Sequence, residues 1–178
     1  MFLSCLIVKR LFFALWPDDA VRKQCIELAH HLLKAGDRPV DPGNLHVTLV
    51  FLGAVDDVLE SAMVQTADEM KKLEPVTIHF DELSFWRKPG IICLTSSYPD
   101  DKAMILAEKL SAMVLSLDHP IDERAYRPHV TLIRKAKQSV QTEFEPVIWH
   151  SNTFCLVESC SAPGGVDYRV IRQWPLLG

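Results

Sequence analysis

The sequence has no excess of positive charge. Its 178 residues include 19 Lys and Arg against 23 Asp and Glu, so the formal net charge is −4. Proteins that bind long nucleic acids through the phosphate backbone usually carry a basic excess, because their cations replace the counterions of the nucleic acid. A role in RNA chemistry would therefore need a local site for a chain terminus, not a surface that follows a duplex.

The sequence also lacks the spacing patterns of disulfide, metal and several catalytic sites. The number of cysteines is odd and no CxxC pair occurs, which favours a reducing, cytoplasmic compartment. There is no Gly-rich phosphate loop and no GxSxG elbow, and the histidines outside the motif described below have no metal-ligand spacing. We therefore expect no metal and no cofactor, and we interpret the cysteines as small apolar side chains.

No apolar segment is long enough to cross a membrane. The apolar stretch 1–16 is interrupted by Lys9 and Arg10, and a spanning helix needs about 20 residues. A secretory signal carries its positive charge before the apolar run, whereas here the charge follows residues 1–8. We interpret residues 1–9 as an extra leader, exclude a membrane partner, and predict the first core strand over Leu11–Leu15.

The pattern of apolar residues and turn signals predicts one domain over residues 1–178. Strand-like and helix-like segments mix without the strict alternation of a doubly wound sheet, which indicates an α+β fold with mainly antiparallel sheets. Gly53 is predicted to end one strand, and a turn at Lys88-Pro89-Gly90 to join two others. Helices are expected between Pro17 and Gly36, over 56–73 and over 101–117, and strands over 11–15, 47–52, 76–80, 91–95, 129–134, 153–158 and 168–174.

One tetrapeptide, His-Val-Thr-Leu, occurs twice. The copies begin at His46 and His129, about half the chain apart, and each follows a helix and a proline-containing loop. The simplest explanation is an internal duplication of a helix–loop–strand unit. The repeat thus predicts two pseudo-symmetric lobes around a central cleft, with helices on the outer faces.

The period of a β-strand gives the repeat a chemical meaning. Side chains at i and i+2 share a face, so His46 and Thr48 should project together while Val47, Leu49 and Phe51 point to the opposite face. The second copy should repeat this arrangement. Two such strands facing each other would bring two imidazoles and two hydroxyls to one cleft.

These four groups suit the cleavage of a phosphodiester. A neutral imidazole can accept a proton from water, and an imidazolium can donate one to the departing oxygen. The threonine hydroxyls can donate hydrogen bonds to the non-bridging oxygens, where negative charge accumulates. An acid and a base on opposite sides of the phosphorus permit in-line displacement without a metal ion.

The sequence resembles the two-histidine phosphoesterase superfamily, and specifically the RNA 2′,3′-cyclic phosphodiesterases, also called the 2′-5′ RNA ligase family. The resemblance extends from about Arg10 to Leu177. It rests on the segments 10–14 (RLFFA), 44–49 (NLHVTL) with 51–53 (FLG), 127–132 (RPHVTL), and the ending Gly165…Tyr168…Trp174-Pro175-Leu176.

The resemblance implies hydrolysis of a terminal 2′,3′-cyclic phosphate to a 2′-phosphomonoester, with 2′-5′ ligation as the chemical reverse. It implies that His46 is the proton donor, that His129 is the proton acceptor, and that Thr48 and Thr131 contact the phosphate. Arg134 matches an arginine of the family, although strict alternation would place it on the face opposite His129. The expected partners are RNA 3′ ends or nucleotides with a cyclic phosphate, bound by a monomer.

Two alternatives remain open at this level. The enzyme could act on small cyclic nucleotides, or the cleft could bind a nucleotide without turnover. The intact His and Thr of both motifs argue against the latter, because a binding module does not need two titratable groups. Outside the motifs, the basic clusters 87–88 and 134–137 could meet RNA phosphates at the cleft rim. Phe85, Trp86 and Trp149 could stack on a base, although core packing is the commoner use of such aromatics.

Overall fold

The structure is a computed structural model, and it describes residues 8–98, 100–122, 124–163 and 165–177. These residues form an α+β fold, as the sequence predicts. The α-helices are α1 (Asp19–Leu32), α2 (Asp57–Glu69) and α3 (Asp101–Ser116), and a 3-10 helix, η1, covers Pro42–Asn44. The strands are β1 (Val8–Leu15), β2 (Arg38–Pro39), β3 (Val47–Asp56), β4 (Val76–Phe80), β5 (Glu82–Trp86), β6 (Ile91–Thr95), β7 (His129–Arg134), β8 (Val147–Ser151), β9 (Thr153–Ala162) and β10 (Gly165–Pro175).

The strands form antiparallel sheets. One sheet has the order β10-β9-β1-β3, a second has the order β2-β7-β6-β5, and β4 pairs with β8 in a third. Each His-Val-Thr-Leu motif therefore enters a different four-stranded sheet, through β3 and β7. The pseudo-twofold relation between two lobes stays a prediction.

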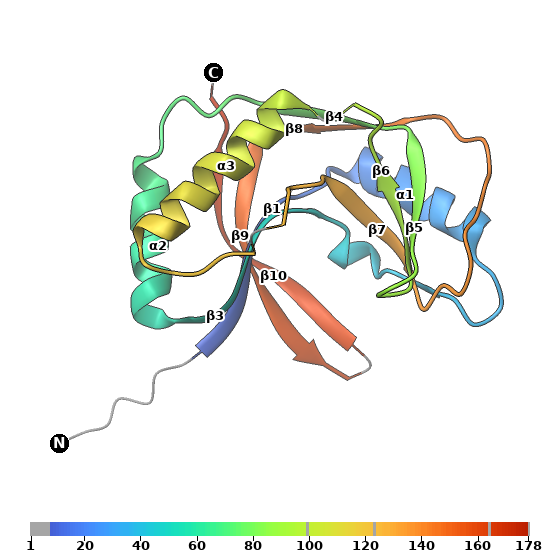
Figure 1. Ribbon diagram of the computed structural model, residues 1–178, viewed down its shortest axis with the longest axis horizontal. Coiled ribbons are helices and arrows are strands. Elements are labelled where there is room, and N and C mark those ends of the chain that lie inside the picture. Colours follow the sequence, from blue (N-terminus) through green and yellow to red (C-terminus); the bar gives the residue numbers. More distant parts are fainter. Residues whose placement is uncertain (1–7, 99, 123, 164, 178) are drawn as a thin grey trace.

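Helices α1 and α3 each follow a strand of one four-stranded sheet and pack on a strand of the other (Figure 1). Helix α1 follows β1 of the first sheet but packs on β7 and β8, whereas α3 follows β6 of the second sheet but packs on β3 and β4. Helix α2 packs on β3, α3 and β10. Among the described residues no helix is both long and apolar enough to span a membrane.

Each α-helix begins in the same way, at an aspartate N-cap. Its carboxylate accepts a hydrogen bond from the backbone N–H three residues later, which satisfies one of the free donors of the first turn. The N-cap pairs are Asp18 with Val21, Asp56 with Leu59 and Asp100 with Ala103, each at 2.8 Å.

One continuous cluster of buried apolar side chains connects both four-stranded sheets. It includes Phe13 and Phe154 of the first sheet, Ile92 and Leu132 of the second, and Trp149 of β8, which is fully buried. Burial of this area is the main stabilising contribution to the fold.

The first strand is longer than predicted. Val8 and Lys9 pair with Asp56 and Val55 of β3, and Lys9 Nζ forms an ion pair with Glu60 at 2.7 Å. The interpretation of residues 1–9 as a leader is therefore wrong for residues 8 and 9, while residues 1–7 lie outside the described part of the chain. The sequence pattern placed the strand start too late because Lys9 and Arg10 interrupt the apolar stretch. In the structure, the ion pair with Glu60 of α2 accommodates the charge of Lys9 within the strand.

Gly53 does not end β3, contrary to the prediction. It adopts a positive φ of 70° inside the strand, where Leu52 is an extra residue between two pairs of the β1–β3 ladder, and pairing continues to Asp56. Glycine tolerates this backbone conformation at a bulge. The turn at residues 88–90 joins β5 to β6, whereas the sequence analysis expected it to join the strands 76–80 and 91–95. Three strands, β2, β5 and β8, were not predicted from the sequence.

Candidate active site

His46 directly precedes β3 and is held by two hydrogen bonds. Its Nδ1 lies 2.7 Å from the backbone oxygen of Asn44, and its Nε2 lies 3.0 Å from Oγ1 of Thr48. A carbonyl oxygen can only accept, so Nδ1 carries the proton in the neutral ring and Nε2 accepts from the threonine hydroxyl. His46 and Thr48 thus share a face, as predicted from the strand period.

His129 begins β7 and repeats part of this arrangement. Its Nδ1 lies 2.8 Å from the backbone oxygen of Arg127, which is again two residues earlier in the chain. The same tautomer follows, with Nε2 as the unprotonated nitrogen. The two motifs therefore orient their imidazoles by the same local hydrogen bond.

Both motifs contain a β-bulge at their leucine. In the β1–β3 ladder, Ala14 pairs with Thr48 and Phe13 with Val50, so Leu49 is the extra residue. In the β6–β7 ladder, Cys93 pairs with Thr131 and Ile92 with Ile133, so Leu132 is extra. A bulge inserts one residue and reverses the alternation of the side chains that follow it.

The bulge at Leu132 corrects the predicted position of Arg134. Because Thr95, Cys93 and Ile91 of β6 share one face, their partners His129, Thr131 and Arg134 share one face as well. Strict alternation would have put the arginine on the opposite side. The structure brings the three side chains together along β7.

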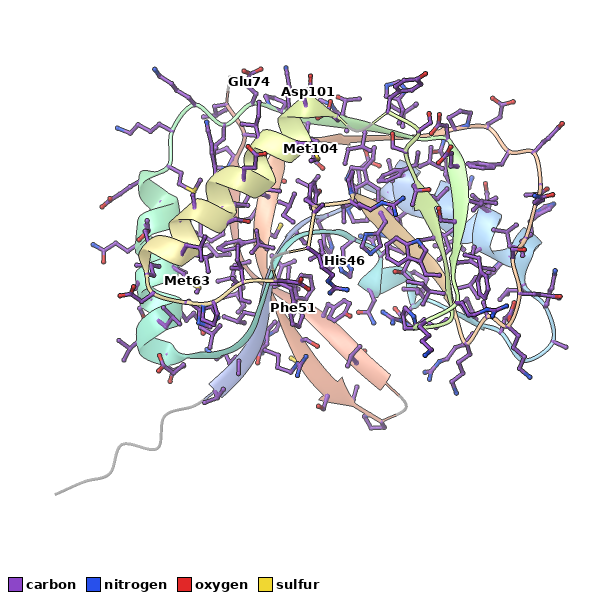
Figure 2. The ribbon with its side chains drawn as sticks, viewed as in Figure 1. His46, Phe51, Met63, Glu74, Asp101 and Met104 are labelled. Atoms are coloured by element: carbon purple, nitrogen blue, oxygen red, sulfur yellow. The ribbon has the colours of Figure 1, made fainter. Side chains whose placement is uncertain are left out.

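The bulge at Leu49 likewise corrects the predicted position of Phe51. It pairs with Phe12, whose ring contacts His46 at a centroid distance of 4.9 Å, so Phe51 lies on the histidine face of β3 and not on the opposite face. It is 46% exposed, and the guanidinium of Arg10 lies 5.6 Å from its ring centre. In the view of Figure 2, His46 and Phe51 are both labelled near the middle of the picture.

Phe51 and Arg10 were not among the predicted site residues. Phe51 follows the first motif histidine by five residues, and Arg134 follows the second by five. The repeat itself could therefore have identified Phe51 as the counterpart of Arg134, had a bulge been assumed at both leucines.

Aromatic rings surround the two imidazoles. His46 contacts Tyr168 edge-on at 5.0 Å and stacks with Trp16 at 6.0 Å, and His129 contacts Trp86 at 4.6 Å. Trp86 therefore packs on the site, whereas the proposed stacking of a base on Trp149 is wrong because that ring is fully buried. Phe85 packs against the core.

Burial lowers the pKa of both histidines. The pKa of His46 falls to about 4, chiefly through burial; the hydrogen bond to Asn44 opposes this shift, and the positive charges of His129 and Arg134 add to it. Burial likewise lowers the pKa of His129; the hydrogen bond to the backbone oxygen of Arg127 opposes this shift, and the positive charge of Arg127 adds to it. Both rings are thus neutral at pH 7 in the free protein, and an anion bound between them would favour their protonated forms.

The rest of the site chemistry is limited. No group of three or more His, Cys, Asp or Glu side chains that could hold a metal ion occurs within the described residues. Burial raises the pKa of the Cys25 and Cys93 thiols to about 12, so neither is a thiolate at neutral pH.

Comparison with known proteins places this geometry in a family. The chain is 29% identical over 171 residues to the RNA 2′,3′-cyclic phosphodiesterase of Escherichia coli, covering 94% of this chain and 97% of that protein. It is 26% identical over 182 residues to the RNA 2′,3′-cyclic phosphodiesterase of Thermus thermophilus, covering 95% and 91%. The crystal structure of E. coli LigT complexed with 3′-AMP superposes with a TM-score of 0.88 at 27% identity, over 97% of this chain and 100% of that one.

A family model agrees with these individual matches. The model described as the 2′-5′ RNA ligase superfamily matches residues 17–158, which include both motifs and most of the chain. The chain belongs to the 2′-5′ RNA ligase superfamily.

Proposed function

We propose that this protein hydrolyses the 2′,3′-cyclic phosphate at RNA 3′ ends to a 2′-phosphomonoester. The observation that carries the proposal is the duplicated motif: two histidines, each with Nδ1 held by a carbonyl two residues earlier, each beside a threonine on the same face. The names of the E. coli and T. thermophilus relatives support the same substrate.

The two histidines divide the proton transfers. His129 accepts a proton from the attacking water through Nε2 as the new P–O bond forms, and His46 donates a proton from Nε2 to the ribose 3′ oxygen as the P–O3′ bond breaks. The product carries the phosphate on the 2′ oxygen. General acid and base assistance of this kind contributes about 10²–10⁴-fold for each group.

Substrate binding favours the protonated form of the donor, which takes its proton from solvent. The pKa of His46 is about 4 in the free protein, so its ring must gain a proton as the anionic phosphate enters. The negative charge offsets the burial and the positive charge of Arg134, while His129 stays neutral as the base. The stacked Trp16 ring also favours the imidazolium, because the face of an aromatic ring attracts a cation.

Three groups hold the phosphate oxygens in this proposal. The hydroxyls of Thr48 and Thr131 donate to the non-bridging oxygens, and Arg134 supplies a positive charge on the same face of β7 as His129. All three interactions strengthen as negative charge develops in the transition state. No step requires a metal ion.

The test is hydrolysis of an oligonucleotide with a terminal 2′,3′-cyclic phosphate in the presence of EDTA, with the 2′-phosphate product identified by NMR. His46→Asn and His129→Asn should each lose on the order of 10²-fold or more in rate. The matched control is His30→Asn, since His30 is exposed on α1. Loss of wild-type turnover with EDTA, restored by a divalent ion, would contradict the mechanism; binding without turnover would identify a non-catalytic module.

Small cyclic nucleotides are the second candidate substrate. Structures of E. coli LigT include complexes with 3′-AMP, ATP and NADP+, so a related protein accommodates ligands of nucleotide size. A side-by-side comparison of kcat/KM for a cyclic mononucleotide and a cyclic-phosphate-ended oligonucleotide separates the two candidates. The reverse reaction, 2′-5′ ligation, is assayed with the same oligonucleotides.

We further propose that the protein acts as a monomer in the cytoplasm. The described cysteines Cys25, Cys93, Cys155 and Cys160 are all free thiols, in keeping with a reducing compartment. Light scattering tests the monomer, and a molecular mass of twice 20.2 kDa would exclude it.

A further inference from the structure

A groove adjoins the candidate active site on the side of β2 and the β9–β10 hairpin. Its volume is about 690 Å³, within the range of about 300–1,000 Å³ that is typical of small-molecule pockets. Its lining includes Arg38, Arg134 and Lys135, together with residues 162–163 and 165–168 of the hairpin. We call it the basic groove.

The basic groove is continuous with the surroundings of His46. Arg134, Tyr168 and Asn44 all line it. The charge of Arg134 lowers the pKa of His46, the ring of Tyr168 contacts the imidazole, and the backbone oxygen of Asn44 accepts its Nδ1–H. A molecule whose phosphate reaches His46 therefore has its next segment at the mouth of this groove.

Asn44 also fixes the hairpin wall. Its side chain donates to the backbone oxygen of Val166 at 2.7 Å and accepts from the backbone N–H of Tyr168 at 2.9 Å. The same residue thus orients His46 with its main chain and the groove wall with its side chain. These hydrogen bonds hold the β9–β10 hairpin and the His46 imidazole in a fixed relative position.

Arg38 and Arg134 form an unfavourable pair in the absence of a ligand. They are direct cross-strand partners in the β2–β7 ladder, so their side chains leave the same face of the sheet. Like charges in this position destabilise a sheet. Within the described part of the chain, neither arginine nor Lys135 forms a salt bridge, although the groove lining also includes two carboxylates, Asp41 and Asp167. The Asp41 carboxylate accepts a hydrogen bond from the backbone N–H of Gly43.

We infer that the basic groove binds the phosphodiester immediately upstream of the terminal cyclic phosphate, and so selects RNA chains over cyclic mononucleotides. The inference rests on the proposed function. The upstream phosphate would lie between Arg38 and Lys135, one nucleotide from the phosphate held near Arg134. An anion there relieves the repulsion between the arginines, and only an oligonucleotide carries it.

The experiment compares two substrates, adenosine 2′,3′-cyclic phosphate and a trinucleotide that ends in the same group. The variants are Arg38→Gln, Lys135→Gln and the double variant, and Lys137→Gln is the matched control, since Lys137 is exposed on the same loop but does not line the groove. Melting temperatures establish that each variant is folded.

The wild type should prefer the trinucleotide. Each single variant should lower kcat/KM for the trinucleotide about three- to fivefold through KM, and the double variant about tenfold or more, while the mononucleotide rate stays within about twofold of wild type. The slope of log(kcat/KM) against log[salt] for the trinucleotide should become shallower by about 0.7 for each contact removed. Lys137→Gln should change neither the kcat/KM for the trinucleotide nor its salt dependence.

Other outcomes would overturn the inference. If the variants affect both substrates equally, or neither, the groove does not bind the upstream phosphate, although the proposed function stands. If the wild type hydrolyses neither substrate, the proposed function fails. The groove is then tested by fluorescence anisotropy of a labelled trinucleotide with a 2′-phosphate end, and equal binding by wild type and the double variant would reject it.

Discussion

Arg134 lies on the same face of β7 as His129, although the two residues are five positions apart, an odd spacing that strict alternation would place on opposite faces. The extra residue Leu132 in the β6–β7 ladder produces this relationship. The same bulge at Leu49 brings Phe51 to the face of His46. One sheet thus adds a cation beside its histidine, and the other adds an exposed aromatic ring with Arg10 above it. Both copies of the motif therefore have the β-bulge, but the side chain that the bulge places beside the histidine differs: it is Phe51 in one copy and Arg134 in the other.

Arg134→Gln should both weaken phosphate binding and raise the pKa of His46. The arginine charge lowers that pKa, so its removal shifts it upward. We expect kcat/KM to fall on the order of 10-fold to 10²-fold, as for other donors to a developing negative charge. Arg134→Lys should keep the low pKa but recover only part of the activity, because an ammonium cannot form the two parallel hydrogen bonds of a guanidinium. Titration of His46 by NMR measures the first effect, and an unchanged pKa in Arg134→Gln would contradict it.

Thr48→Val and Thr131→Val should each lower kcat by about tenfold, less than either histidine variant, because each removes one hydrogen bond to the phosphate. Thr48→Val should have the further effect of freeing His46 Nε2, which accepts from that hydroxyl at 3.0 Å. Steady-state kinetics on the cyclic-phosphate oligonucleotide measures both. Thr66→Val is the control, since its hydroxyl bonds within α2. Equal losses in all three variants would point to a folding defect.

The dependence of kcat/KM on pH should be a bell with its maximum below about 6.5, the ordinary pKa of histidine. The reacting form needs one protonated and one neutral ring, and both pKa values are lowered in the free protein, that of His46 to about 4. The profile of kcat should lie at higher pH, because the bound phosphate raises both values. The limbs belong to the coupled pair and not to one residue. A kcat/KM optimum above pH 7 would be inconsistent with these shifts.

The stability of the fold should fall as the pH drops from about 6.5 to about 4, partly because of His46. Its pKa is lower in the folded chain than in the unfolded one, so the unfolded state binds more protons in this window. The contribution is fully present above pH 6.5 and is lost as the pH falls through 4, by about 3 kcal/mol, because each pKa unit corresponds to about 1.4 kcal/mol. Urea unfolding of wild type and His46→Asn across this range gives the difference directly. A constant difference between the two proteins from pH 4 to 7 would refute the assignment.

The sequence by itself determined the class of the fold and the motif that marks the site. Helix positions followed from apolar periodicity, which is a local effect that acts within a few residues. The strand 129–134 was predicted with the bounds that β7 has. The pairs His46–Thr48 and His129–Thr131 followed from the period of two, because no bulge interrupts those three residues in either ladder.

Only the tertiary structure decided where the side chains beyond the motifs lie. A bulge depends on the pairing register between two neighbouring strands. The sequence of β7 alone does not specify how it pairs with β6, so the bulge at Leu132 could not be predicted from it. The short strand β2 forms only because α1 crosses to the second sheet and delivers Arg38 opposite Arg134. The low pKa of His46 likewise comes from burial under Phe12, Trp16 and Tyr168, which β1 and β10 bring from opposite ends of the chain. Long-range packing sets these relationships, and local patterns cannot encode them.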